Sequence, residues 1–158
     1  MSSKKKILLL LLLLFIAMQF IQPARNKSSI VQQADMIRHF TVPANAARIL
    51  KTSCYDCHSN NTPYPWYANI QPIGWLLAKH IRDGKRELNF SDFATYSQRR
   101  QLSKLKAIAN SIKDGSMPLA SYTLLHGDAK LSDSSKQQLI EWALKIKDSV
   151  EAGHKADE

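Results

Sequence analysis

The sequence predicts an all-α protein. Apolar residues recur at the helical period in three separate stretches, and no stretch alternates apolar and polar residues as a half-buried strand does. The chain has 158 residues and 44% hydrophobic residues, which suits one modest domain with a real core. We therefore expect about four helices joined by long loops, with an apolar N-terminal helix in front of them.

The N-terminal helix has the pattern of an export signal. Lys4, Lys5 and Lys6 precede an almost unbroken apolar run that ends at Ile21. Residues 1–22 are therefore expected to be a signal-anchor or a cleaved signal peptide, and the positive-inside rule places the lysines in the cytoplasm. Everything after Pro23 would then lie on the side of the membrane opposite the cytoplasm, in an oxidising compartment.

The remaining chain divides into a tether, a domain and a tail. The polar segment 23–42 is predicted to be the tether, 43–148 the domain and 149–158 a frayed tail. Four helices are expected in the domain: one that starts at Pro43 and runs into Cys54, one over 73–83 that Gly84 ends, one over 102–112 that stops by Gly115, and a last one that Ser132 caps. The loops between them are long, and no role is evident for the loop 84–97.

The net charge of +9 could indicate nucleic acid, a membrane surface or an acidic protein partner. The basic residues are scattered and no nucleic-acid-binding motif accompanies them, so we expect no nucleic-acid partner. A solvated basic face is the simplest interpretation.

The two cysteines lie in the motif Cys54-Tyr55-Asp56-Cys57-His58. Cys-x-x-Cys-His is the attachment pattern of c-type haem, in which both thiols form thioethers with vinyl groups and the histidine binds the iron. A disulfide over two intervening residues would stabilise little and would leave His58 unexplained. A thioredoxin-like site needs a βαβ unit, and a zinc site needs further paired ligands; neither is visible.

A second axial ligand is expected on the opposite side of the iron. Met117, in a loop and next to Pro118, is the natural candidate, although methionine also fills gaps in cores. His80, on the apolar face of helix 73–83, is the alternative, and an open site is the third possibility. The choice matters because a thioether raises the reduction potential relative to a second imidazole.

The order of these motifs resembles that of a known family. The segment "CYDCHSNNTPYPWYANIQPIGW", the later "IKDGSMP" and the final "LS…LIEW" are similar to the bacterial haem-binding domain family, which is related to class I cytochrome c. The resemblance covers about residues 25–147. It implies one covalent haem c per chain at Cys54 and Cys57, with His58 as proximal and Met117 as distal ligand.

Class I cytochromes also fix the proximal histidine through a proline carbonyl. Pro72 is the best match for that role in this chain, and Pro65 is the second. Trp66 and Trp75 could donate their indole N–H groups to the haem propionates, since buried tryptophans usually find a partner, but core packing alone would also explain them.

The function expected from this reading is single-electron transfer rather than enzymatic catalysis. The protein would be a monohaem cytochrome at the periplasmic face of the inner membrane, or in the periplasm if the signal is cleaved. Its basic surface would favour redox partners with an acidic docking surface. The alternative is a haem enzyme or a gas or peroxide sensor, with an open or histidine-ligated distal position.

Overall fold

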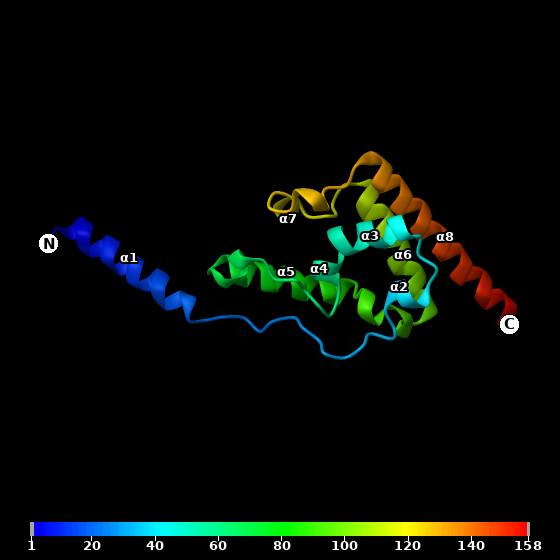
Figure 1. The fold of residues 1–158 in the computed structure, drawn as a ribbon, viewed down its shortest axis with the longest axis horizontal. Coiled ribbons are helices and arrows are strands. Elements are labelled where there is room, and N and C mark those ends of the chain that lie inside the picture. Colours follow the sequence, from blue (N-terminus) through cyan, green and yellow to red (C-terminus); the bar gives the residue numbers. More distant parts are fainter. Residues whose placement is uncertain (1, 158) are drawn as a thin grey trace.

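The computed structural model describes residues 2–157, and side chains as far as residue 153 (Figure 1). This part of the chain is helical and contains no strand, which confirms the all-α prediction. It holds eight α-helices and three short 3-10 helices, three α-helices more than the four domain helices and one N-terminal helix that were expected. The three additional helices are single turns of four residues, too short to produce a periodic sequence pattern: α2 (Met36–His39), α4 (Tyr55–His58) and α7 (Ala120–Thr123).

Five α-helices are long, and three 3-10 turns connect some of them. The long helices are α1 (Ser3–Gln19), α3 (Ala44–Ser53), α5 (Ile73–Glu87), α6 (Gln98–Lys113) and α8 (Asp133–Asp157). The 3-10 turns are η1 (Trp66–Asn69), η2 (Phe90–Thr95) and η3 (Gly127–Ala129).

Most predicted helix boundaries agree with the structure. Pro43 is the N-cap of α3, and Gly115 follows α6 with a φ of 74°, a conformation that favours glycine. The hydroxyl of Ser132 accepts a hydrogen bond from the Ser135 backbone N–H at 3.2 Å, as an N-cap does. The tail prediction was wrong, because α8 continues to Asp157 instead of fraying after Asp148.

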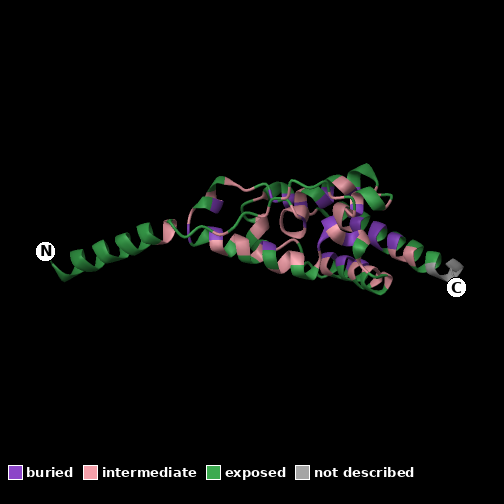
Figure 2. Cartoon of the chain, turned by 90° about the horizontal axis from the view of Figure 1, so that it is seen from below, coloured by how far each residue is buried: buried purple, intermediate pink, exposed green. Residues whose placement is uncertain are grey.

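The core lies where α3, α6 and α8 meet. α8 packs along α6, and α3 contacts α8 (Figure 1). Figure 2 shows the buried residues concentrated in this half of the molecule, away from α1. The side chains come from five elements: Met36, Ala46, Ile49, Leu50, Phe90, Phe93, Leu105, Ile108, Ala109, Ile112, Leu139, Trp142, Ala143 and Ile146.

The N-terminal helix extends away from the domain. Every side chain from Ile7 to Ile16 is exposed, which leaves an apolar helix without a cover. None of the helices in residues 2–157 has both the length and the apolar character needed to cross a membrane. The segment after α1 runs along α5 towards α2 (Figure 1) and is bonded to the domain, as described below.

Candidate functional site

The Cys-x-x-Cys-His motif forms a separate helical turn after α3. The chain leaves helical geometry at Cys54, with φ −130° and ψ −43°, and re-enters it as α4. The His58 N–H donates to the Cys54 carbonyl at 3.0 Å, which closes one turn and brings these two residues to the same side. Cys54 and His58 accordingly line one cavity, whereas Cys57 lines a neighbouring one.

The imidazole of His58 is held in one orientation. Its Nδ1 lies 2.9 Å from the Leu88 carbonyl oxygen. A carbonyl can only accept, so Nδ1 carries the proton, and in the neutral ring Nε2 keeps its lone pair. Burial lowers the pKa of His58, so the neutral ring is favoured. The imidazole can therefore bind a metal through Nε2.

This contact corrects the expected role of Pro72. The carbonyl that accepts the His58 proton belongs to Leu88, not to Pro72 or Pro65. Pro72 is the N-cap of α5, and Pro65 is the N-cap of η1. Pro72 stands at the N-terminal end of α5 and Leu88 at its C-terminal end, which explains why the Leu88 carbonyl and not that of Pro72 reaches the histidine.

A polar cluster fixes the turn that carries the Leu88 carbonyl. Asn89 is 6% exposed; its Oδ1 accepts from the Ser91 N–H at 3.1 Å and its Nδ2 donates to Asn60 Oδ1 at 2.8 Å. The Asn60 N–H in turn donates to the Ser91 hydroxyl at 3.0 Å. Residues just after His58 are thus tied to residues just after Leu88. The loop 84–97, for which the sequence suggested no role, orients the histidine.

Gly84 allows α4 and α5 to approach closely. A Cβ at this position would lie 2.8 Å from the Cys57 carbonyl oxygen, a contact that real Cβ atoms do not make. The helix nevertheless continues through Gly84 to Glu87, so its predicted end at residue 84 was wrong. The glycine is required for packing against the motif and not as a helix stop.

Met117 lines the same cavity as Cys54 and His58. The cavity measures about 240 Å³, and its other walls come from α6 and the 87–90 turn: Glu87, Leu88, Phe90, Lys104, Ala107, Ile108, Ser111 and Ile112. The Met117 N–H donates to the Ser111 carbonyl at 3.1 Å, which holds the loop against the end of α6. The methionine side chain is 37% exposed and is not core filling.

His80 lies beside the other cysteine. A smaller cavity of about 70 Å³ is lined by Cys57, His80 and Tyr67, together with apolar residues of α5 and the α7 region. His80 does not line the cavity that contains His58 and Met117.

A polar network around Tyr122 was not anticipated from the sequence. The Tyr122 hydroxyl donates to the Asp56 carboxylate at 2.7 Å, and its ring stacks on His126 with centroids 4.2 Å apart. Asp56 stands inside the Cys-x-x-Cys-His motif, so this network attaches α7 to α4. Spacing alone offered no signal for it, because 66 residues separate the tyrosine from the aspartate.

Both cysteines are free thiols. Burial, followed by the nearby Cys57, raises the pKa of Cys54 to about 12; burial, followed by the nearby Asp56, raises that of Cys57 to about 11. A thiol redox site needs the opposite shift. Among the described residues, no group of three or more His, Cys, Asp or Glu side chains is placed to hold a metal ion.

The two tryptophans do not face the cavity of His58 and Met117. The Trp75 indole N–H donates to the Ile21 carbonyl at 2.8 Å. Trp66 is 76% exposed, and its ring meets Tyr67 edge-on. Neither residue lines either cavity, so the structure does not bring them to the proposed ligands.

The donor set fits haem. Two unpaired thiols, an imidazole whose Nδ1 carries the proton and a thioether line two cavities at the motif, and the first cavity has mainly apolar walls. Such an all-α domain with a Cys-x-x-Cys-His turn defines a haem-binding protein. The family model of the haem-binding domain matches residues 13–145, and the chain belongs to this family. Its cofactor is therefore haem. Searches of curated proteins and of solved structures each gave no match to the chain.

Proposed function

We propose that the protein is a monohaem c-type cytochrome that transfers single electrons between redox partners. Cys54 and Cys57 would hold one haem covalently. As each thiol adds to a vinyl group, the S–H bond and the vinyl π bond would break, a C–S bond would form at one vinyl carbon, and the hydrogen would pass to the other. His58 is the proximal ligand and Met117 the distal one. When bound, haem supplies an iron that alternates between the ferrous and ferric states.

The observation that carries this proposal is that His58 and Met117 line one cavity together with Cys54. The histidine comes from α4 and the methionine from the loop between α6 and α7, so two distant parts of the sequence converge on this space. If both residues bound the haem iron, they would leave no iron position free for a substrate, which would suit an electron carrier better than an enzyme.

We place the protein at the periplasmic face of the inner membrane. The three lysines at positions 4–6 precede the apolar helix α1, and the exposed leucines of that helix have no cover within the domain. Haem attachment to cysteines is compatible with the oxidising side of a membrane. We infer that residues 1–22 hold the protein at the bilayer.

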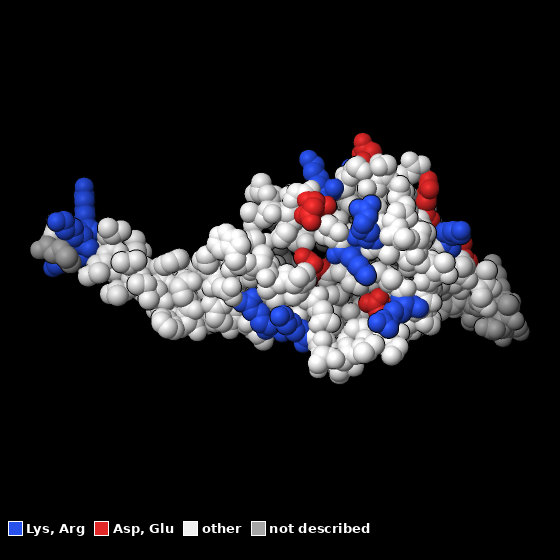
Figure 3. Space-filling model, viewed as in Figure 1, with Lys and Arg blue, Asp and Glu red and all other residues white. Residues whose placement is uncertain are grey.

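The charge distribution suits a partner with an acidic docking surface. Lys and Arg side chains outnumber acidic ones by 22 to 13, and Figure 3 shows them spread over the face in view rather than gathered in one stripe. Long-range attraction of this kind accelerates encounter and weakens with added salt.

The test compares Met117→Ala with His80→Ala in the haem-loaded protein. Met117→Ala is expected to lower the reduction potential, to remove the far-red absorption band of methionine-ligated ferric haem and to allow carbon monoxide binding. His80→Ala is the matched control and should change none of these. Loss of the band in His80→Ala, with the band retained in Met117→Ala, would overturn the ligand assignment. Carbon monoxide binding by the unmodified protein would overturn the assignment as an electron carrier.

A further inference from the structure

The end of α1 is bonded firmly to the domain. Gln71 is fully buried, and its backbone N–H donates to Gln19 Oε1 at 2.9 Å. Its side-chain Nε2 donates to Gln22 Oε1 at 2.9 Å, and Gln22 Nε2 donates to the Asn69 carbonyl at 3.0 Å. Gln19, at the end of α1, and Gln22, just after it, are thus bonded to Gln71 at the η1–α5 junction. No loose linker therefore separates α1 from the domain.

The following residues continue this attachment. The Trp75 indole holds the Ile21 carbonyl, and Arg25 hydrogen-bonds Asn69 and lies over the Tyr64 ring. The Asn26 amide donates to the Ser59 carbonyl at 2.8 Å, directly after the haem motif. The segment predicted to be a tether is therefore a strap on the domain, and it fixes where α1 departs.

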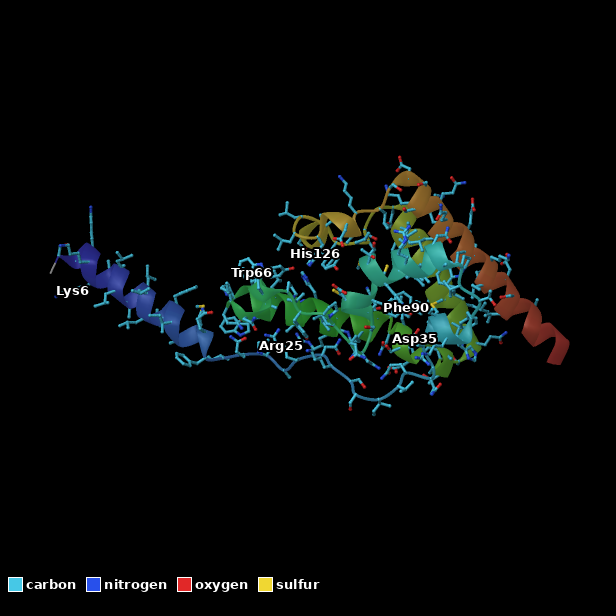
Figure 4. The ribbon with its side chains drawn as sticks, viewed as in Figure 1. Lys6, Arg25, Asp35, Trp66, Phe90 and His126 are labelled. Atoms are coloured by element: carbon cyan, nitrogen blue, oxygen red, sulfur yellow. The ribbon has the colours of Figure 1, made fainter. Side chains whose placement is uncertain are left out.

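Apolar side chains are exposed just after α1 and on two segments of the domain that a hydrogen bond links to one another. They are Phe20 at 84% exposure, Ile21 at 65%, Trp66 at 76% and Leu124 at 83%, and we call them the α1-facing surface. The Tyr67 hydroxyl lies 3.2 Å from His126 Nε2 and joins η1 to the α7 region, so Trp66 and Leu124 belong to neighbouring segments. Figure 4 shows Trp66 at the end of the domain nearest α1.

None of these four side chains lines either of the cavities beside the cysteines. The segments that supply the surface also lack acidic residues. No Asp or Glu occurs in 1–34, 57–82 or 115–127, whereas Arg25, Lys79 and Arg82 do. An exposed tryptophan with apolar neighbours and basic residues is suited to the headgroup region of an anionic bilayer.

We propose that the α1-facing surface rests on an anionic membrane, which holds the domain in one orientation. This inference depends on the membrane attachment proposed above and adds to it the face that touches lipid. A bilayer is favoured over a protein because Phe20 and Ile21 directly follow the apolar helix, and Gln22 bonds to the η1 segment that carries Trp66. With α1 in the bilayer, the α1-facing surface can then contact the same bilayer.

The test is photo-crosslinking of the full haem-loaded chain in vesicles of phosphatidylcholine and phosphatidylglycerol. The crosslinking residue p-benzoylphenylalanine replaces Trp66 or Leu124 in the surface, Leu12 in α1, or Leu144, an exposed leucine of α8 that serves as matched control. We expect lipid adducts by mass spectrometry at Trp66, Leu124 and Leu12 but not at Leu144. At Leu124 the yield should fall several-fold in phosphatidylcholine alone.

The outcomes separate this inference from the attachment itself. Adducts at Leu12 but not at Trp66 and Leu124 would refute the docked surface and leave the attachment intact. The absence of adducts at Leu12 would refute the attachment as well. A crosslinked dimer at Leu124 in place of lipid adducts would show that a second copy covers this surface, and would also overturn the inference. Each variant must keep the absorption spectrum of the unmodified holoprotein, and the two surface positions test the inference separately.

Discussion

His58 Nδ1 and the Leu88 carbonyl oxygen lie 2.9 Å apart, although 30 residues separate them. A carbonyl on Nδ1–H makes the imidazole a stronger donor at Nε2, as such outer partners do for metal-bound histidines. A stronger donor stabilises ferric iron and lowers the reduction potential. If His58 binds the haem iron as proposed, the turn that presents Leu88 is expected to influence the reduction potential.

Asn89→Ala is expected to raise the reduction potential. Asn89 holds the turn through Ser91 and Asn60, and its loss frees the Leu88 carbonyl from His58. One hydrogen bond of about 1 kcal/mol corresponds to roughly 40 mV for a one-electron couple. Spectroelectrochemical titration of the holoprotein measures the shift.

Asn45→Ala is the control for that measurement. Asn45 is an exposed asparagine whose amide donates to Gln138 at 2.7 Å, and it lines neither cavity at the haem motif. Its replacement should leave the potential unchanged. Equal potentials in the two variants would show that the Asn89 cluster does not act on His58.

After the double substitution Cys54→Ser and Cys57→Ser, no haem is expected to remain bound to the chain when the protein is denatured. Serine hydroxyls do not form the thioethers. Peroxidase staining of haem after denaturing electrophoresis gives the readout. Met117→Ala is the matched variant and should retain the stain, because it removes a ligand and not an attachment point. Persistent stain in the double variant would exclude covalent attachment through these thiols.

Gly84→Ala is expected to destabilise the folded protein by about 1–3 kcal/mol, because the new methyl group would press on the Cys57 carbonyl and force α4 from α5. Gly153→Ala is the control: a Cβ there meets nothing within 4 Å, and alanine in a helix gains up to about 1 kcal/mol over glycine. Urea unfolding of both holoproteins compares them. Equal midpoints would mean that α4 tolerates the displacement.

Before haem attachment, the thiols are expected to resist alkylation. Burial raises the pKa of Cys57 from 9.0 to about 11, which favours the protonated thiol. At pH 8 the thiolate fraction is then roughly a hundredfold lower than in the unfolded chain. Because only the thiolate reacts, alkylation of the folded chain should be slower by a similar factor. Iodoacetamide labelling of the haem-free protein, with and without urea, tests this. Fast labelling of the folded chain at pH 7 would instead indicate a redox-active thiol.

The sequence predicted the parts of the fold that depend on local chemistry. Leu105, Ile108 and Ile112 repeat at the helical period, and the structure buries them on one face of α6. Ser132 begins a helix by capping it with its hydroxyl, and Gly115 follows the end of another because it tolerates a positive φ. The haem family followed from the Cys-x-x-Cys-His turn combined with the later motifs, and the family comparison confirms it.

Features that depend on long-range packing were not predictable in the same way. Gly84 has the pattern of a helix stop, but its role is set by Cys57 on another helix. Leu88 acts through its backbone carbonyl, which is common to every residue, so its side chain gives no signal. Residues 23–42 appear polar and featureless in sequence because their hydrogen-bond partners lie some 30 to 60 residues away.

The buried amide of Gln71 bears on how the chain could be matured by proteolysis. A signal peptidase that cut after Ala24 would remove Gln19 and Gln22, and with them the acceptors of two Gln71 N–H groups. A buried donor without a partner costs about 1–3 kcal/mol, so the shortened protein would be less stable than its precursor. Residues 19–22 are thus part of the folded domain, and the fold is expected to be more stable with them than without them.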